Sequence, residues 1–114
     1  MNYIFAIGDI HGRLDLLRLA AKAIDTYLSD RAACGVAIFL GDYVDRGPDS
    51  RGVIEFLMNA QRNGPLLCLK GNHEEMMLEA LTSGDSSRWI ASGGAATLSS
   101  YGGEEIPPLS LIHI

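Results

Sequence analysis

Hydrophobic residues in this chain form short continuous runs, separated by longer stretches in which they recur every three or four positions. Short apolar runs that end at a glycine or a polar residue are typical of buried strands. The predicted strands span residues 3–7, 36–40 and 66–69. None of these runs alternates between apolar and polar positions, which favours a parallel sheet covered on both faces.

The longer stretches between the runs predict helices. From 14 to 28, apolar residues fall on one helical face: Leu17, Ala20, Ala21, Ile24, Tyr27 and Leu28. A second helix starts at a cap supplied by Asp49 or Ser50 and ends near Asn63. A third spans 74–81. Beyond residue 84 the periodicity weakens, and short helices are expected on either side of Gly93-Gly94.

Strand, helix, strand, helix, strand in this order predicts two right-handed βαβ units. The fold class is therefore α/β, with a parallel βαβαβ sheet flanked by helices. The chain of 114 residues suits a single domain over 1–114, and it shows no internal repeat.

Charge and composition exclude several functions. The net charge of −5 argues against nucleic acid as the main partner. The N-terminus is too short an apolar stretch for a signal peptide or a membrane span, so we expect a cytoplasmic protein without a membrane partner. Cys34 and Cys68 lie far apart in the sequence, which indicates neither a zinc knuckle nor a disulfide framework. We expect Cys68 in the core and Cys34 at a turn or a strand entry.

Each predicted strand is followed by a glycine and a cluster of polar residues. These clusters are Gly8-Asp-Ile-His-Gly12, Gly41-Asp-Tyr-Val-Asp-Arg-Gly47 and Lys70-Gly-Asn-His-Glu74. Because the carboxyl ends of parallel strands lie along one edge of the sheet, we expect the three clusters to converge there. The candidate site residues are Asp9, His11, Asp42, Asp45, Arg46, Asn72 and His73. Oxygen ligands combined with imidazole suit Mn, Fe, Zn or Mg.

Each cluster also has a structural interpretation. An aspartate after a strand, such as Asp9, is often only a helix N-cap. Asn72 could occupy a turn in the left-handed conformation, and Glu74 could cap a helix or belong to the site. Turn chemistry alone does not require two histidines and three aspartates at three successive strand ends, so a site is the better interpretation.

The motifs GDIHG, GDYVDRG and GNHE, in this order, resemble those of the calcineurin-like metallophosphoesterase superfamily. Within it they are similar to the phosphoprotein phosphatases that act on phosphoserine and phosphothreonine, including the bacterial ones. The resemblance covers residues 3–81 and continues more loosely through Trp89, Gly93-Gly94 and residues 97–102. It implies that the sheet is the N-terminal half of a metallophosphoesterase β-sandwich.

The resemblance also implies a role for each candidate residue. Asp9 and His11 would bind a first metal, Asp42 would bridge two metals, and Asn72 would bind the second and contact substrate. His73 would act as general acid, oriented by Asp45, and Arg46 would grip the substrate phosphate. The implied reaction is hydrolysis of a phosphoprotein or small phosphoester, with two divalent metal ions, manganese foremost, and without a phosphoenzyme.

Two alternatives stay open. A dinucleoside-polyphosphate hydrolase, such as one cleaving diadenosine tetraphosphate, would be built on the same loops. An incompetent fragment that only binds metal or phosphate would belong to another class. Neither the physiological substrate nor an oligomeric state follows from the sequence.

The resemblance weakens near the end of the sequence. Relatives of this kind are about twice as long and supply two more histidine ligands from their later half, where this chain offers only His113. Residues 103–108 still resemble the family, whereas residues 109–114 do not continue the pattern, so the end of the domain stays open over 105–114. We therefore expect a domain truncated at its C-terminus, with an incomplete second metal site and little activity of its own.

Overall fold

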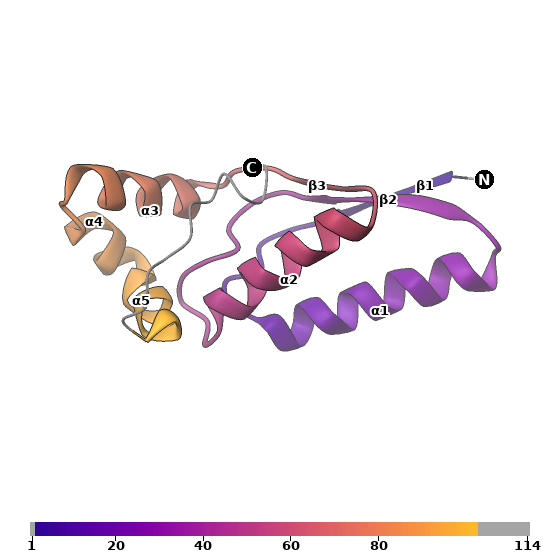
Figure 1. Cartoon of the computed structure of the whole chain (residues 1–114), viewed down its shortest axis with the longest axis horizontal. Helices are drawn as coiled ribbons and strands as arrows, with labels where there is room; N and C mark the ends of the chain where they lie inside the picture. The colour runs from indigo at the N-terminus through magenta and orange to yellow at the C-terminus, as the bar shows by residue number, and fades with distance from the viewer. Residues whose placement is uncertain (1, 103–114) are drawn as a thin grey trace.

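Three parallel strands form one sheet in the order β1-β2-β3 in the computed structural model, which describes residues 2–102 (Figure 1). The strands are β1 (Asn2–Ile7), β2 (Cys34–Phe39) and β3 (Leu66–Cys68). Helices α1 (Leu14–Asp30) and α2 (Ser50–Asn63) connect them. In the parallel register, Ile4 lies opposite Val36 and Ile38 lies opposite Leu67. The α/β class and the βαβαβ order are confirmed.

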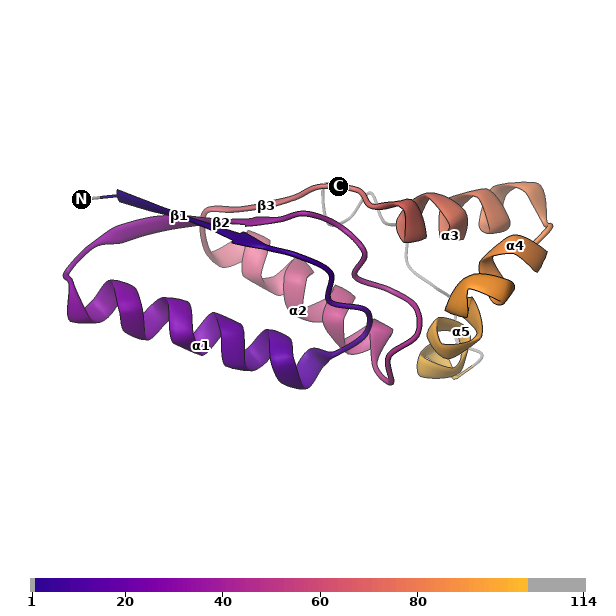
Figure 2. The same ribbon diagram turned by 180° about the vertical axis from the view of Figure 1, so that it is seen from behind.

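Both connecting helices lie on the same face of the sheet (Figures 1 and 2). The strand order advances in one direction, and two right-handed crossovers in one direction place their helices on one side. Exposure alternates along β1, and the side chains of Ile4 and Leu67 are 74% and 56% exposed. The prediction of a sheet covered on both faces is wrong for residues 2–102.

The covered face packs aromatic and aliphatic side chains against α1 and α2. The ring of Tyr27 on α1 meets Tyr3 and Phe5 edge-on, at centroid distances of 5.2 and 5.8 Å. Leu17 from α1 and Leu57 from α2 are buried in the same core. Such edge-to-face pairs add to the free energy of area burial. The amphipathic pattern of 14–28 therefore located the buried side of α1.

Helix ends follow local chemistry. Asp49 is the N-cap of α2, and its carboxylate accepts a hydrogen bond from the Gly52 N–H at 2.8 Å. This resolves the choice between Asp49 and Ser50 in favour of Asp49. Helix α3 (Asn72–Ser83) ends at Gly84, which adopts φ +78°. Glycine reaches this left-handed conformation without a steric penalty from Cβ.

The chain after α3 turns back toward the carboxyl ends of the strands (Figure 1). It forms α4 (Ser87–Trp89), the π-helical turn η1 (Ile90–Gly94) and α5 (Ala95–Tyr101). Gly93, at φ +109°, interrupts the helical backbone between them. The short helices expected around this glycine pair are confirmed. In the described residues 2–102, no helix is long and apolar enough to cross a membrane.

Glu74 joins the loops that follow β2 and β3. Its side chain is fully buried, and its carboxylate accepts backbone N–H bonds from Gly71 at 3.0 Å, Asp42 at 2.6 Å and Tyr43 at 2.9 Å. The Val44 N–H lies 3.4 Å from the same carboxylate. The bond from the Gly71 N–H caps α3, whereas the bonds from Asp42 and Tyr43 come from the loop after β2. Glu74 therefore caps α3 and also acts as a clamp that holds the loops after β2 and β3 together.

Burial raises the pKa of Glu74, and the surrounding backbone N–H groups offset part of that effect. A carboxyl group removed from water without partners would be strongly unfavourable, so the N–H groups make its position tolerable. The backbone N–H groups of the two loops therefore satisfy the hydrogen-bonding capacity of the buried carboxylate, and the carboxylate in turn holds the two loops together.

Substituting glutamine for Glu74 is expected to lower the free energy of unfolding by about 1–3 kcal/mol. Glutamine keeps one acceptor oxygen but turns an NH₂ group toward backbone donors that then lack a partner. Urea denaturation followed by circular dichroism measures the change. The matched control is Glu75→Gln, because Glu75 is the neighbouring residue and is exposed. Equal stability of the two variants would contradict the clamp.

The two cysteines occupy contrasting environments, as expected from the sequence. Cys34 is exposed at the start of β2, whereas Cys68 is buried at the end of β3. Burial raises the pKa of the Cys68 thiol to about 11. Since the thiolate is the reactive form, both the burial of Cys68 and its raised pKa protect it from thiol reagents at pH 8.

We expect one fast-reacting thiol per folded chain with 5,5′-dithiobis(2-nitrobenzoate) at pH 8, and two in urea. The Cys34→Ser variant should lose the fast phase and keep the slow one. Two thiols of equal reactivity in the folded chain would show that β3 does not end in the core.

Candidate functional site

The polar clusters after the three strands converge at one edge of the sheet. We call them the first loop (Gly8–Gly12), the second loop (Gly41–Gly47) and the third loop (Lys70–Glu74). The N–H groups of Ile10 and His11 both donate to the carbonyl of Asp42, and the Gly12 N–H donates to the carbonyl of Tyr43. These backbone hydrogen bonds join the first and second loops directly, independently of any ligand.

The second and third loops meet at Gly41 and Gly71. Gly41 adopts φ +121°, and a Cβ at this position would lie 2.6 Å from the Gly71 nitrogen. A side chain on Gly71 would collide with the carboxylate of Asp42. The Tyr43 hydroxyl, 2.6 Å from the carbonyl of Leu69, adds a contact beneath this crossing. Two glycines therefore allow the closest approach between the loops.

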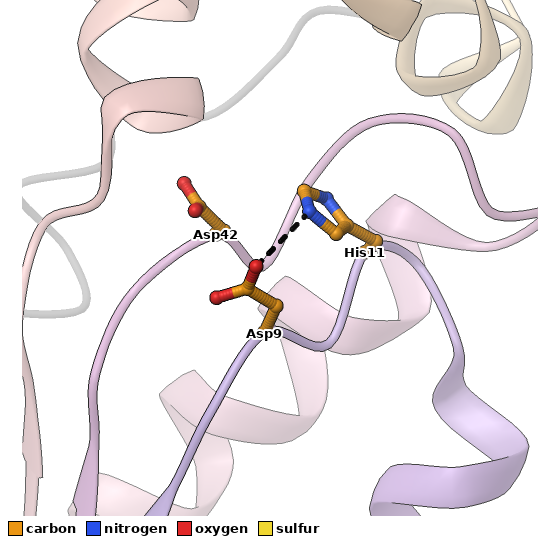
Figure 3. A group of neighbouring side chains, drawn as sticks. All are labelled: Asp9, His11 and Asp42. Carbon is orange, nitrogen blue, oxygen red and sulfur yellow. Dashed lines mark ion pairs between the residues drawn. The ribbon is translucent and has the colours of Figure 1, made fainter.

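Asp9, His11 and Asp42 form a compact group of potential metal ligands. One ligand atom from each lies within 4.8 Å of the others, and Figure 3 shows the Asp9 carboxylate and the His11 ring turned toward each other beside Asp42. The His11 Nε2 atom lies 3.6 Å from Asp9 Oδ2. Two carboxylates and an imidazole are a donor set suited to Mn, Fe or Zn.

The imidazole of His11 is in the tautomer that metal binding requires. Its Nδ1 lies 2.9 Å from the carbonyl of Val44, which can only accept a hydrogen bond. Nδ1 therefore carries the proton, and Nε2 keeps its lone pair for a cation. Asp9 is not the N-cap of α1, because that position is Arg13. The helix-cap interpretation of Asp9 is wrong, and the residues present fit a divalent metal.

Asn72 is the first residue of α3, and its side-chain amide lies against the Asp42 carboxylate. With its nitrogen turned inward, it donates to Oδ1 at 3.2 Å and to Oδ2 at 3.1 Å. The opposite orientation would bring the amide oxygen to the same place, where a cation held by Asp42 could accept it as a ligand. Asn72 is helical and is not among the residues with positive φ, so its interpretation as a left-handed turn residue is wrong.

His73 and Asp45 form a buried pair. The His73 Nδ1 atom lies 2.7 Å from Asp45 Oδ2, and the two residues are 3% and 0% exposed. The His73 backbone N–H donates to Asp42 Oδ1 at 3.0 Å. The rings of His73 and His11 meet edge-on with centroids 4.7 Å apart. The pair therefore stands directly beside the group of potential metal ligands.

Arg46 lies on the second loop and is exposed. Its backbone N–H donates to the carbonyl of Gly93 at 3.1 Å, which attaches the second loop to η1. Arg46 directly follows Asp45 in the chain, and its side chain is exposed to solvent. Its role in gripping phosphate remains a prediction.

Four candidate residues have a left-handed backbone. The φ values are 45° for His11, 58° for Asp42, 78° for Asp45 and 68° for Arg46. Left-handed backbone is uncommon outside glycine and costs on the order of 1–3 kcal/mol where it is strained. Its concentration in the first and second loops indicates that surrounding contacts hold these residues in place for a function.

The structure brings together six of the seven candidate side chains: Asp9, His11, Asp42, Asp45, Asn72 and His73. Arg46 follows Asp45 on the second loop, and His113 lies outside the described residues. Sequence reasoning did not predict the contacts of Ser50, Trp89 and Thr97. All three are buried, and each contacts Asp45 through a hydrogen bond. Trp89 and Thr97 lie where the family resemblance is looser, and the resemblance implied no role for either residue.

Comparison with known proteins agrees with this geometry. A family model described as calcineurin-like phosphoesterase matches residues 3–111. Serine/threonine-protein phosphatase 2 of Escherichia coli is 39% identical over 94 residues, which cover 82% of this chain and 39% of that protein.

Two relatives carry other names. The zinc-dependent endopolyphosphatase of Saccharomyces cerevisiae is 32% identical over 78% of this chain and 26% of its own length. A symmetrical bis(5'-nucleosyl)-tetraphosphatase of Legionella pneumophila is 36% identical over 70% of this chain and 27% of its own. This chain thus matches less than half the length of each of these relatives. The family model nevertheless spans nearly all of the sequence, and the chain belongs to the calcineurin-like phosphoesterase family.

Proposed function

We propose that this chain carries the metal- and phosphate-binding loops of a metal-dependent phosphomonoesterase of the serine/threonine protein phosphatase type. One observation carries the proposal: Asp9, His11 and Asp42 lie together beside the buried His73–Asp45 pair. A metal-ligand group next to an oriented imidazole is what hydrolysis of a phosphoester by water requires.

Asp9, His11, Asp42 and Asn72 would hold the metal ions, for which we propose two divalent cations with manganese foremost. Bound there, such cations lower the pKa of a coordinated water and offset the negative charge of a phosphate. Asp42 would be the ligand shared between the metal ions, since its carboxylate belongs to the group with Asp9 and His11 and also lies against the Asn72 amide.

The remaining residues would act on the substrate. Arg46 would bind phosphate oxygens through its planar guanidinium, which offers paired donors. His73 would donate a proton to the leaving alkoxide as the ester P–O bond breaks, while a water molecule forms the new P–O bond and releases its proton to solvent. None of the three loops contains serine or cysteine, which supports direct transfer to water.

A dinucleoside-polyphosphate hydrolase is the second candidate, supported by the similarity to the Legionella tetraphosphatase. Assaying a phosphothreonine peptide and diadenosine tetraphosphate side by side, each with manganese, separates the two. Turnover of only the dinucleotide would replace the proposed substrate class.

Substituting asparagine for Asp42 should weaken manganese binding by about tenfold or more, because the site loses a charged ligand shared between the loops. Isothermal titration calorimetry of the metal-free chain with MnCl₂ measures this. Asp85→Asn is the matched control, since Asp85 is exposed and lies after α3. Equal affinities for the two variants would contradict the assignment of Asp42.

Arg46→Lys should raise KM for the phosphopeptide by about tenfold while leaving manganese affinity unchanged, because lysine cannot present paired donors to phosphate. Arg62→Lys, at an exposed position in the last turn of α2, is the control for general effects of replacing an arginine by a lysine. An unchanged KM would remove Arg46 from the phosphate site.

His73→Asn distinguishes an enzyme from a domain that only binds metal or phosphate. The enzyme hypothesis expects kcat to fall by about 100-fold or more, because the loss removes a general acid. Manganese and inorganic phosphate should still bind. No metal-dependent turnover in the unsubstituted chain would instead favour the binding-only alternative.

A further inference from the structure

Asp45 has more partners than the pairing with His73 requires. Its Oδ2 atom bonds to His73, and its Oδ1 atom accepts from the Trp89 indole N–H and the Thr97 hydroxyl, each at 2.8 Å. Asp45 is fully buried, and in the described part of the chain these three groups are the hydrogen-bond partners of its carboxylate. Two of the three come from the segment 89–97, outside the three loops.

Thr97 holds the backbone of Asp45 as well as its side chain. The Asp45 N–H donates to Thr97 Oγ1 at 2.9 Å, and the same hydroxyl lies 2.8 Å from Asp45 Oδ1. One hydroxyl therefore accepts from the main chain and donates to the carboxylate of the same residue. This arrangement supports Asp45 at φ +78°, a conformation that would be strained without it.

The segment 89–97 also contacts the residue after Asp45. The Gly93 carbonyl accepts the Arg46 N–H at 3.1 Å, and a Cβ on Gly93 would lie 2.7 Å from Arg46 Cγ. The chain can make this approach because Gly93 has no side chain and adopts φ +109°. The segment thus contacts both the residue that orients His73 and the residue proposed to bind phosphate.

We propose that Trp89 and Thr97 are positioning residues for the proton donor of the reaction. By fixing Asp45 Oδ1, they leave Oδ2 as a fixed acceptor for His73 Nδ1–H, so that Nε2 is the nitrogen that serves the substrate. This inference rests on the proposed function. It adds a fourth segment, residues 89–97, to the three loops as part of the working site.

Conservative variants separate this role from simple core packing. Trp89→Phe keeps an aromatic ring against Gly94 but removes the N–H. Thr97→Val keeps the shape of the side chain and removes the hydroxyl, whereas Thr97→Ser restores the hydroxyl. Leu98→Ala is the control, because Leu98 is the next residue along α5 and its side chain is 42% exposed.

The composition of the chain suits nuclear magnetic resonance. It has one tryptophan and three histidines, so the indole N–H gives a single signal and the imidazoles can be assigned by substitution. The ring nitrogens of His73 report its tautomer directly. Spectra are recorded on the metal-free chain and with Mg²⁺ or Zn²⁺, since Mn²⁺ would broaden the signals.

In the unsubstituted chain we expect a slowly exchanging indole N–H whose shift changes in Asp45→Asn. The neutral form of the His73 ring should be the Nδ1–H tautomer, so that the proton given to the leaving group is the second one, carried on Nε2. Trp89→Phe and Thr97→Val should shift the His73 ring signals toward a mixture of tautomers, while Thr97→Ser and Leu98→Ala should leave them as they are. Folded Trp89→Phe and Thr97→Val with unchanged His73 signals would overturn the proposal. An indole N–H in free exchange with water would do so without any variant.

Kinetics provide the second measurement. Trp89→Phe and Thr97→Val should each lower kcat by about tenfold, because a misoriented general acid loses part of its contribution to the rate. KM should change by less than about twofold. A loss carried entirely by KM would overturn the positioning role. Absence of turnover in the unsubstituted chain would refute the proposed function instead, and the His73 signals would still decide whether Trp89 and Thr97 fix the ring.

Discussion

The clamp made by Glu74 is the interaction on which the site depends most. One buried carboxylate accepts N–H groups from Gly71 and from the chain at Asp42 to Val44, and so joins the third loop to the second. The sheet brings the two loops to the same edge but does not set the distance between them. The clamp fixes that distance, and it places the Asp42 carboxylate where the His73 N–H and the Asn72 amide reach it.

Two buried carboxylates divide the work of organising the loops. Glu74 binds only main-chain groups and determines where the loops run. Asp45 binds three side chains and determines how one imidazole is oriented. Hydrogen-bond donors surround both carboxylates, as buried polar groups require. This arrangement leaves the exposed carboxylate of Asp9 and the half-buried one of Asp42 open to cations.

Much of the fold and the candidate site could be predicted from the sequence, for physical reasons. Apolar runs located the strands to within about two residues, and parallel topology then required their carboxyl ends to meet. That requirement brought His11, Asp42 and His73 together without knowledge of any side-chain contact. Asn72 and Glu74 remained ambiguous, because a helix start and a turn have the same local composition.

Other features could not be predicted, because they depend on contacts far apart in the chain. An apolar run such as 3–7 has the same composition whether one or both of its faces are covered, so the exposed position of Ile4 had no local signal. The indole of Trp89 and the hydroxyl of Thr97 reach Asp45 across 44 and 52 positions. No spacing rule of helices or strands extends over such separations.

The distance in sequence between Thr97 and Asp45 has a consequence for the order of folding. The β1-β2-β3 sheet and its two helices can form from residues 2–68, since their pairings are sequential. In that partly folded state the Asp45 carboxylate still lacks the donors of residues 73, 89 and 97. Closing so long a loop is opposed by chain entropy until stabilising contacts can form. We therefore expect the candidate site to be completed after the sheet that supports it.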